Sequence, residues 1–242
     1  MPDPVLQQVE HFSNPGMTAN DSFKPVTKYF DRITRPEQII QSLPQAIQTM
    51  LDPADSGPAC LSLCQDVQGE TFDYPEEFFK ERIHNIRRPK PDDFQIKQAM
   101  EKIKKSKKPI IISGGGVFYS DAMDELGSFA IKHNIPVTQT VMGYSTMKRD
   151  HSHFLGPIGG LGGRAANNLA KETDLAICVG TKLADFTTGS WANFENPEFK
   201  LVSINIARHD ANKHLAEAVI GDAKVLSLIH ISEPTRHTRI SF

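Results

Sequence analysis

Lys108-Pro-Ile-Ile-Ile-Ser113 runs directly into Gly114-Gly115-Gly116, and this join of an apolar run to three glycines decides the fold. Further apolar runs follow at regular spacing, at residues 135–141, 175–179 and 201–206, with helical patterns between them. Short continuous apolar runs bounded by Gly and Pro are typical of parallel strands that are covered on both faces. The alternation therefore predicts an α/β fold with a doubly wound parallel sheet.

The bulk composition fits a globular protein and excludes some classes of function. The 242 residues are 39% hydrophobic and 23% charged, and their formal net charge is −2, so we expect no nucleic-acid partner. No apolar run approaches membrane-spanning length, so we expect no membrane partner. Three cysteines are too few and too scattered for a disulfide framework, which favours a reducing compartment and predicts a cytoplasmic protein.

The chain is expected to divide into four segments. The first holds one helical pattern and one strand, too little to bury both faces of a sheet, so we interpret it as the C-terminal piece of another α/β domain. The last looks like the translation of a sequencing-library adapter. The segments are 1–70, the domain piece; 71–107, a linker with a helix near 92–106; 108–224, the Rossmann-like domain; and 225–242, a non-native tail.

Local signals place the elements. Thr34 and Pro36 mark the start of a helix that runs to Met50, and Pro44 should bend or interrupt it. After the three glycines, Ser120 or Asp121 should cap a helix that ends at Asn134. The remaining expected elements are strands 59–64, 136–141, 175–179, 201–206 and 218–220, a Gly-rich connection at 156–163 and a helix at 164–171.

The three glycines are the candidate cofactor-binding residues. Gly114, Gly115 and Gly116 follow a strand, where a Rossmann fold places its phosphate-binding loop. The spacing is not G-x-G-x-x-G, and no acidic residue closes the next strand at 139–141. Close packing of the turn against its neighbours is the alternative interpretation, and the sequence leaves both open.

Other candidates favour structural roles. His151 and His153 could ligate a metal, but no further ligands stand at suitable spacing, so we expect surface histidines. Cys60 and Cys64 lie too far apart along a strand to share a metal or a disulfide, so we expect them in the core. The sequence thus predicts no catalytic residue and no metal ligand.

Several segments together resemble the thiamine-diphosphate enzymes of the acetohydroxyacid synthase and pyruvate oxidase superfamily. Asp3–Gln8, Tyr29–Gln38 and Gln65–Glu70 look most like the branch that hydrolyses a cyclic dione in inositol breakdown. The resemblance covers about residues 2–224. The segments that carry it, in order, are Phe23-Lys-Pro-Val-Thr-Lys-Tyr29, the Arg35-Pro-Glu helix, Gly57-Pro-Ala, Gln65-Asp-Val67, Lys108–Gly116 and Asp174–Thr181.

The resemblance implies a subunit of three domains: a pyrimidine-binding domain, a Rossmann-like central domain and a pyrophosphate-binding domain. This chain would hold the end of the first and nearly all of the second. Thiamine diphosphate and Mg²⁺ would lie between the first and third domains of partner subunits, in a homo-oligomer, either a dimer or a tetramer. The groups that hold them map onto no residue here, so neither cofactor is expected to bind this chain alone. The substrate would be a small cyclic polyol dione.

The resemblance also bears on nucleotide binding by the central domain. Relatives that carry ADP-like or flavin cofactors there often have an acidic residue at the end of the strand equivalent to 201–206. Asn205 and Ala207 stand at that place here, which implies a vestigial cleft. Two alternative functions stay open: an enzyme similar to acetolactate synthase, and a nucleotide-binding Rossmann-like module.

Overall fold

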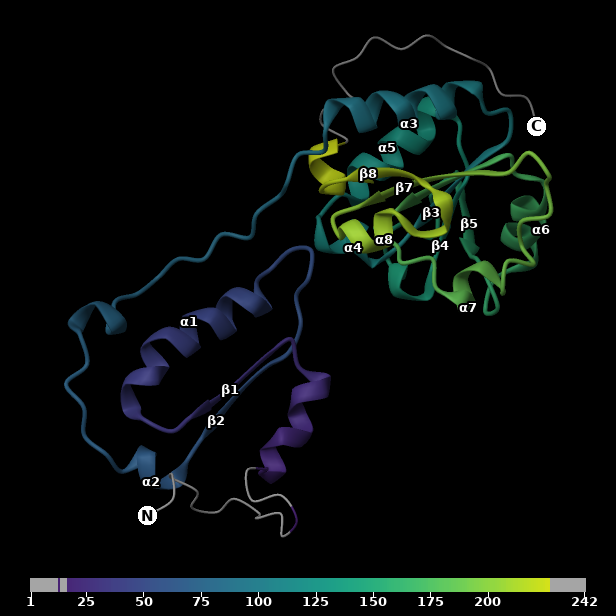
Figure 1. The fold of residues 1–242 in the computed structure, drawn as a ribbon. Coiled ribbons are helices and arrows are strands. Elements are labelled where there is room, and N and C mark those ends of the chain that lie inside the picture. The colour runs from purple at the N-terminus through teal and green to yellow at the C-terminus, as the bar shows by residue number, and fades with distance from the viewer. Residues whose placement is uncertain (1–12, 14–16, 227–242) are drawn as a thin grey trace. The chain divides into compact units, whose positions relative to one another are not determined.

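The computed structural model describes residue 13 and residues 17–226 of the chain. These residues belong to two compact units, Met1–Arg87 and Arg88–Phe242 (Figure 1). The segment Asp3–Gln8 and nearly all of the expected non-native tail, 225–242, lie outside the described residues. Each unit is described by itself.

The smaller unit is built around two parallel strands. β1 (Tyr29–Ile33) pairs with β2 (Ala59–Leu63), and α1 (Ile39–Met50) packs against both. A small core forms where the buried side chains of Ile33, Cys64 and Val67 meet. The remaining elements of this unit are η1 (Ala19–Val26), η2 (Pro36–Gln38), α2 (Gln65–Gln68) and η3 (Glu76–Phe79).

The start of the first helix differs from the expectation. Gln38, and not Thr34, supplies the capping side chain: its Oε1 accepts hydrogen bonds from the backbone N–H groups of Thr34 at 2.7 Å and Arg35 at 2.9 Å. Pro36 does occupy the first position of η2, where its missing N–H costs nothing. Pro44 does not interrupt α1, which runs unbroken from residue 39 to residue 50.

The larger unit alternates strands and helices, as the apolar runs predict. All of its strand pairs are parallel. Its elements are α3 (Asp93–Lys105), β3 (Pro109–Ser113), α4 (Gly115–Tyr119), α5 (Met123–His133), β4 (Val137–Gln139), η4 (Val141–Gly143), β5 (Phe154–Pro157), α6 (Arg164–Glu172), β6 (Leu175–Val179), α7 (Asp185–Thr188), β7 (Lys200–Asn205), α8 (Arg208–Ala211), η5 (Lys213–Leu215) and β8 (Glu217–Ile220).

The strand order confirms the predicted doubly wound sheet. The six strands lie in the order β5-β4-β3-β6-β7-β8 (Figure 1). Counted from β3 as the first strand, this is the order 3-2-1-4-5-6 of a Rossmann fold. The chain moves outward on one side through β4 and β5, then returns past β3 to β6. The order therefore reverses between β3 and β6, and that point is where α/β sheets of this kind form a crevice.

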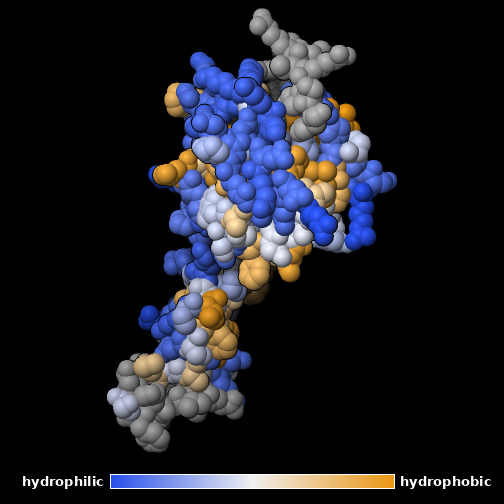
Figure 2. Space-filling model, turned by 90° about the vertical axis from the view of Figure 1, so that its right-hand side faces the viewer, coloured by the Kyte–Doolittle hydropathy of each residue, from blue (hydrophilic) through white to orange (hydrophobic). Residues whose placement is uncertain are grey.

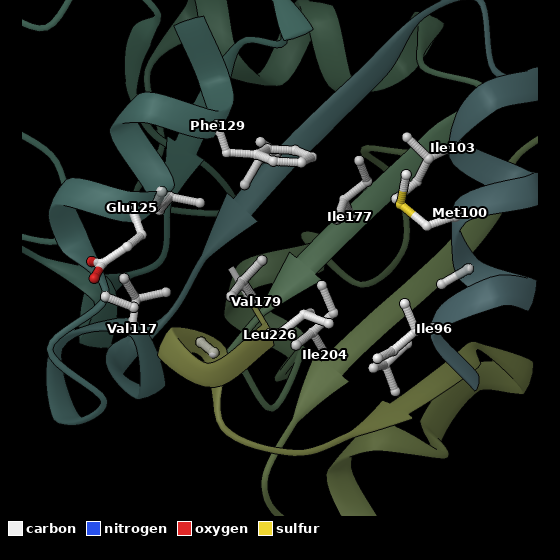
Figure 3. Close-up of a pocket in the computed structure, with 16 residues that line it drawn as sticks. Ile96, Met100, Ile103, Val117, Glu125, Phe129, Ile177, Val179, Ile204 and Leu226 are labelled. Atoms are coloured by element: carbon white, nitrogen blue, oxygen red, sulfur yellow. The ribbon is translucent and has the colours of Figure 1, made fainter. Parts of the chain in front are cut away.

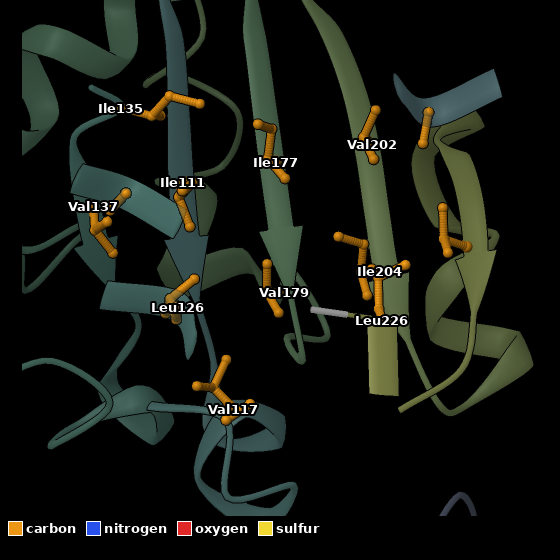
Figure 4. Packing of buried hydrophobic residues seen from close by; sticks show 14 of the residues in the cluster. Ile111, Val117, Leu126, Ile135, Val137, Ile177, Val179, Val202, Ile204 and Leu226 are labelled. Carbon is orange, nitrogen blue, oxygen red and sulfur yellow. The ribbon is translucent and has the colours of Figure 1, made fainter. Parts of the chain in front are cut away.

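The core lies on both faces of this sheet because successive side chains of a strand point to opposite faces. Ile111 and Ile177 belong to the cluster under α3 and α5, shown in Figure 4, whereas Ile110, Ile112 and Cys178 belong to the cluster under α6. Every residue of β3 and β6 is buried. Two-sided burial explains why these strands are uninterrupted apolar runs instead of alternating patterns.

Three local features of the larger unit differ from the expectations. The Gly-rich connection 156–163 begins inside β5, a short strand at the sheet edge. The three glycines are not a bare loop, because α4 begins within them. Neither Ser120 nor Asp121 caps the helix up to His133: its N-cap is Ala122, which makes no side-chain cap hydrogen bond. Asn134 does end that helix, in the left-handed conformation.

The structure divides the chain after Arg87, whereas the sequence suggested boundaries at 70 and 107. α3 belongs to the larger unit, since it packs along β8 and its residues Ile96 and Ala99 join the core. The preceding segment is tied to the same unit, because the Asp222 N–H donates to the Pro89 carbonyl at 2.9 Å. The helix near 92–106 was predicted correctly, with Asp92 as its N-cap.

The surface in Figure 2 is mostly hydrophilic. Figure 2 shows one face of the molecule, where hydrophilic side chains predominate and apolar ones form small separate patches. None of the helices in the described part of the chain is both long and apolar enough to cross a bilayer.

Asp174 links the starts of β3 and β6. Its carboxylate accepts hydrogen bonds from the Ser106 hydroxyl, from the Lys107 N–H at 2.7 Å and from the Lys108 N–H at 3.0 Å. Burial opposes ionisation of this carboxyl, but the hydrogen bonds outweigh it and hold the pKa of Asp174 below its ordinary value. The carboxylate therefore stabilises the folded state only while it is ionised.

The substitution Asp174→Asn should remove this pH dependence. Because the folded-state pKa is lowered, the contribution to unfolding free energy is complete above the unfolded-state pKa of about 3.9 and is lost as the pH falls through the folded-state value. Asp174→Asn should cost about 1 kcal/mol at pH 7, since solvent partly screens the carboxylate, and should flatten the loss of stability in acid. Urea titrations followed by the fluorescence of Trp191, the sole tryptophan, measure both effects in the larger unit.

Asp150→Asn is the matched control, because Asp150 is an exposed carboxylate of the same unit. The unfolding free energy should fall less steeply with decreasing pH in Asp174→Asn than in the unaltered chain. An equally steep fall in both would contradict the stabilising role of the Asp174 carboxylate.

Candidate functional site

The three candidate glycines lie at the reversal of the strand order, against the loop that follows β6. The Gly114 N–H donates to the Val179 carbonyl at 2.8 Å, and the Gly116 N–H donates to the Gly180 carbonyl at 2.9 Å. The Val117 N–H donates to the Gly114 carbonyl at 3.1 Å. These amide groups, which would face a phosphate in a nucleotide-binding loop, are bonded within the chain. We call this contact between Gly114–Gly116 and Gly180–Thr181 the glycine crossing.

The glycine crossing has no room for side chains. A Cβ on Gly116 would lie 2.6 Å from the Gly180 Cα, and a Cβ on Gly114 would lie 2.3 Å from the Gly180 carbonyl oxygen. Gly180 also has a φ of +60°, in the left-handed region that favours glycine. On a further side, a Cβ on Gly115 would lie 2.9 Å from the Met142 carbonyl oxygen of η4. The backbone of three neighbouring loops and the Thr181 side chain therefore fill the space around the three glycines.

Asn205 fastens the crossing to the next strand. It is buried at the end of β7, and its Nδ2 donates to the Thr181 carbonyl at 3.0 Å. Its Oδ1 accepts from the Ala207 N–H at 2.9 Å. The Gly180 N–H donates to the Ile204 carbonyl at 2.8 Å. Both polar atoms of the Asn205 side chain are therefore used within the chain.

The three cysteines are free thiols, and His153 is hydrogen-bonded to a neighbouring side chain. Burial raises the pKa of the Cys178 thiol well above its ordinary range, so it stays protonated and unreactive. Cys64 is also buried, whereas Cys60 is half-buried, and all three cysteines are free thiols. His153 pairs through Nε2 with Asn134 Oδ1 at 3.0 Å; burial, assisted by neighbouring His151, lowers its pKa.

An apolar cavity of about 70 Å³ lies between the sheet and the helices α3 and α5 (Figure 3). Ile96, Met100, Phe129 and Ile177 are among the side chains that line it, and Glu125 is the one charged side chain among the described residues of the lining. A space of this size is a packing gap of the core, too small for a metabolite. We therefore do not assign a ligand or a reaction to this cavity.

Comparisons with known proteins agree with this fold. The family model described as the central domain of thiamine pyrophosphate enzymes matches residues 96–230. The crystal structures of a thiamin diphosphate-dependent enzyme from Mycobacterium smegmatis and of benzoylformate decarboxylase from Polynucleobacter necessarius have TM-scores of 0.68 and 0.70 to this chain. They are 21% and 20% identical to it, and the matches cover 90% and 89% of this chain and 41% and 40% of those chains.

The chain belongs to the thiamine pyrophosphate enzyme family, and its larger unit carries the match to that family's central domain. More specifically, it is 50% identical over 224 residues to the 3D-(3,5/4)-trihydroxycyclohexane-1,2-dione hydrolase of Clostridium perfringens strain 13, a match that covers 93% of this chain. It is 46% identical over 232 residues to the protein of that name from Bacillus cereus strain ZK. The chain spans about a third of the length of these relatives, 35% and 36%. The resemblance inferred from the sequence segments is thus confirmed.

The sequence pointed to the glycines but missed their partner. Gly180 is the residue against which Gly114 and Gly116 pack, and the available signal was a Gly directly after the apolar run of β6. Gln139 was considered only because it is not acidic, yet it is buried at the end of β4 beside a polar cavity. Both roles depend on contacts between strands that are distant in sequence.

Gly116→Ala should destabilise the larger unit by at least about 2 kcal/mol, because the new methyl group would meet backbone atoms that cannot turn away. The control is Gly160→Ala, whose Cβ would make ordinary contacts with the Phe186 ring at 3.7 Å and the Phe186 carbonyl oxygen at 3.8 Å. It should change stability by less than about 0.5 kcal/mol. Urea unfolding followed by Trp191 fluorescence compares them. Equal stability of the two variants would contradict the close approach of the loops.

Proposed function

We propose that this chain is the central-domain part of a thiamine-diphosphate-dependent hydrolase that cleaves a carbon–carbon bond and opens a cyclic 1,2-dione in inositol breakdown. The observation that supports this most strongly is the 50% identity to a protein named 3D-(3,5/4)-trihydroxycyclohexane-1,2-dione hydrolase. The match extends over 93% of the chain, and therefore over both units. Several further relatives that are 46–49% identical carry the same name.

The described residues do not by themselves fit thiamine diphosphate or Mg²⁺. Within residues 13 and 17–226, no three His, Cys, Asp or Glu side chains gather where they could hold a metal ion. The amides of Gly114, Gly116 and Gly180, which could otherwise bind a diphosphate, donate to neighbouring carbonyl groups. We therefore propose that this chain supplies structure to the intact enzyme and that, by itself, it neither binds the coenzyme nor turns over substrate.

We also propose an oligomeric state and a cellular location for the intact enzyme. By the resemblance, the intact enzyme is a homo-oligomer with a small cyclic polyol dione as substrate. A cytoplasmic location is supported by the three cysteines, all of them free thiols, which suit a reducing environment.

Two alternative functions have less support. An enzyme similar to acetolactate synthase would share the fold, but the relatives at about 50% identity are named as dione hydrolases. A free-standing nucleotide-binding module would use Gly114–Gly116, and the close packing of these residues on Gly180 argues against it. We propose that the three glycines serve the crossing and that the nucleotide cleft is vestigial.

Exchange of the central domain tests the proposed function. Residues 88–224 of this chain, placed in the Clostridium perfringens hydrolase in place of the equivalent segment, should give an enzyme that hydrolyses the cyclic dione within about tenfold of the unaltered rate. A tenfold change corresponds to about 1.4 kcal/mol in the activation barrier. The measurement is kcat/KM for the dione.

The matched control carries the central domain of the benzoylformate decarboxylase, which shares the fold at 20% identity, and should lose dione hydrolysis. A chimera with residues 88–224 that folds and binds thiamine diphosphate, yet turns over pyruvate in place of the dione, would contradict the proposal.

A further inference from the structure

A second cavity of about 290 Å³ lies at the carboxyl end of β4, and the glycines of the crossing are not among the residues named in its lining. Ligands of doubly wound sheets bind beyond the carboxyl ends of the strands, so this cavity lies where a ligand is expected. Its volume is near the lower limit of small-molecule sites and suits a metabolite of sugar size, not a dinucleotide. The lining includes Gln139, Tyr144, Met147, Lys148, Arg149 and Phe154.

Gln139 lines this cavity and has a buried side-chain oxygen that makes no hydrogen bond with the described residues. The residue ends β4, is only 6% exposed, and its Oε1 has no hydrogen-bond partner among the residues that the structure describes. Its backbone is fixed, since its carbonyl accepts from the Ile158 N–H at 3.0 Å. Buried amide oxygens are nearly always paired, so an unpaired one at a cavity indicates a missing donor.

Lys148 and Arg149 give the same cavity a positive charge. Both side chains are exposed, and no acidic side chain in the described part of the chain forms an ion pair with either. Their loop is held in place: the His151 N–H donates to the Lys148 carbonyl at 3.1 Å, and the buried Thr146 hydroxyl donates to the Gly143 carbonyl at 2.7 Å. The two cations are thus displayed by an ordered loop.

We propose that this cavity binds a small hydroxylated anion. Lys148 and Arg149 would hold its carboxylate or phosphate group, and one of its hydroxyl groups would donate to Gln139 Oε1. Met147, which is buried, and Phe154, which is half-buried, provide an apolar surface for the carbon skeleton. The inference rests on this cavity alone and does not depend on the proposed function.

Calorimetric titration of the whole chain tests the proposal. The probes are D-glucuronate, which combines hydroxyl groups with a carboxylate, and glucose 6-phosphate, which combines them with a phosphate. We expect at least one to bind with a Kd of about 1 mM or tighter, and the preferred probe identifies the anionic group. Myo-inositol, acetate and inorganic phosphate each carry one of the two features and should bind at least about tenfold more weakly.

Two variants locate the binding. Gln139→Leu and the double variant Lys148→Ala/Arg149→Ala should each weaken binding at least about fivefold. The matched control Lys104→Ala/Lys105→Ala removes two adjacent exposed cations of α3 and should leave binding unchanged. Gln139→Leu should also melt no lower than the unaltered chain, because it removes an unpaired buried polar group.

The proposal is overturned if neither hydroxylated anion binds saturably, if inorganic phosphate or acetate binds as tightly, or if both variants bind like the unaltered chain. Should a variant fail to fold, the side-chain amide resonance of Gln139 in the unaltered chain is decisive. It should shift along the titration with the preferred probe, and a resonance that stays fixed at saturation overturns the proposal.

Discussion

The larger unit depends on one close approach of backbone to backbone, the glycine crossing between Gly114–Gly116 and Gly180. It occurs where the strand order reverses, so it joins the two halves of the sheet. Hydrogen bonds from the Gly114 and Gly116 amides to the β6 end hold the two loops together, and Asn205 ties them to β7. Side chains are excluded from this point, which explains why the apolar run of β3 ends in three glycines.

In this domain the groups that pack the fold together and the groups that line a cavity are at the ends of different strands. A Rossmann fold usually offers its ligand the amides at the reversal of strand order, but here the amides of Gly114 and Gly116 donate to carbonyl groups of the chain itself. At the end of the neighbouring strand β4, Gln139 Oε1 has no hydrogen-bond partner among the described residues, and Lys148 and Arg149 line a cavity. The chain thus belongs to the thiamine pyrophosphate enzyme family. Its glycines at the reversal of strand order are packed against Gly180, and a cavity lies at the end of the neighbouring strand β4.

The sequence predicts the parts of this fold that are governed by two-sided burial. β3, β6 and β7 are continuous apolar runs, and their positions agree with the structure to within a residue. It does not reveal β1, because Asp31 and Arg32 interrupt its apolar pattern, nor β5, a half-buried edge strand that contains Gly156 and Pro157. The closeness of Gly180 and the environment of Gln139 are also hidden, because both arise only when strands distant in sequence come together.

Amide hydrogen exchange measured by NMR tests the closed crossing most directly. If the Gly114 and Gly116 N–H groups are bonded to the β6 end as described, they should exchange only on opening of the whole unit, as slowly as the amides of β3. Exchange of these two amides at the rate of an exposed loop would contradict the account, because a crossing with free donors could accept a phosphate.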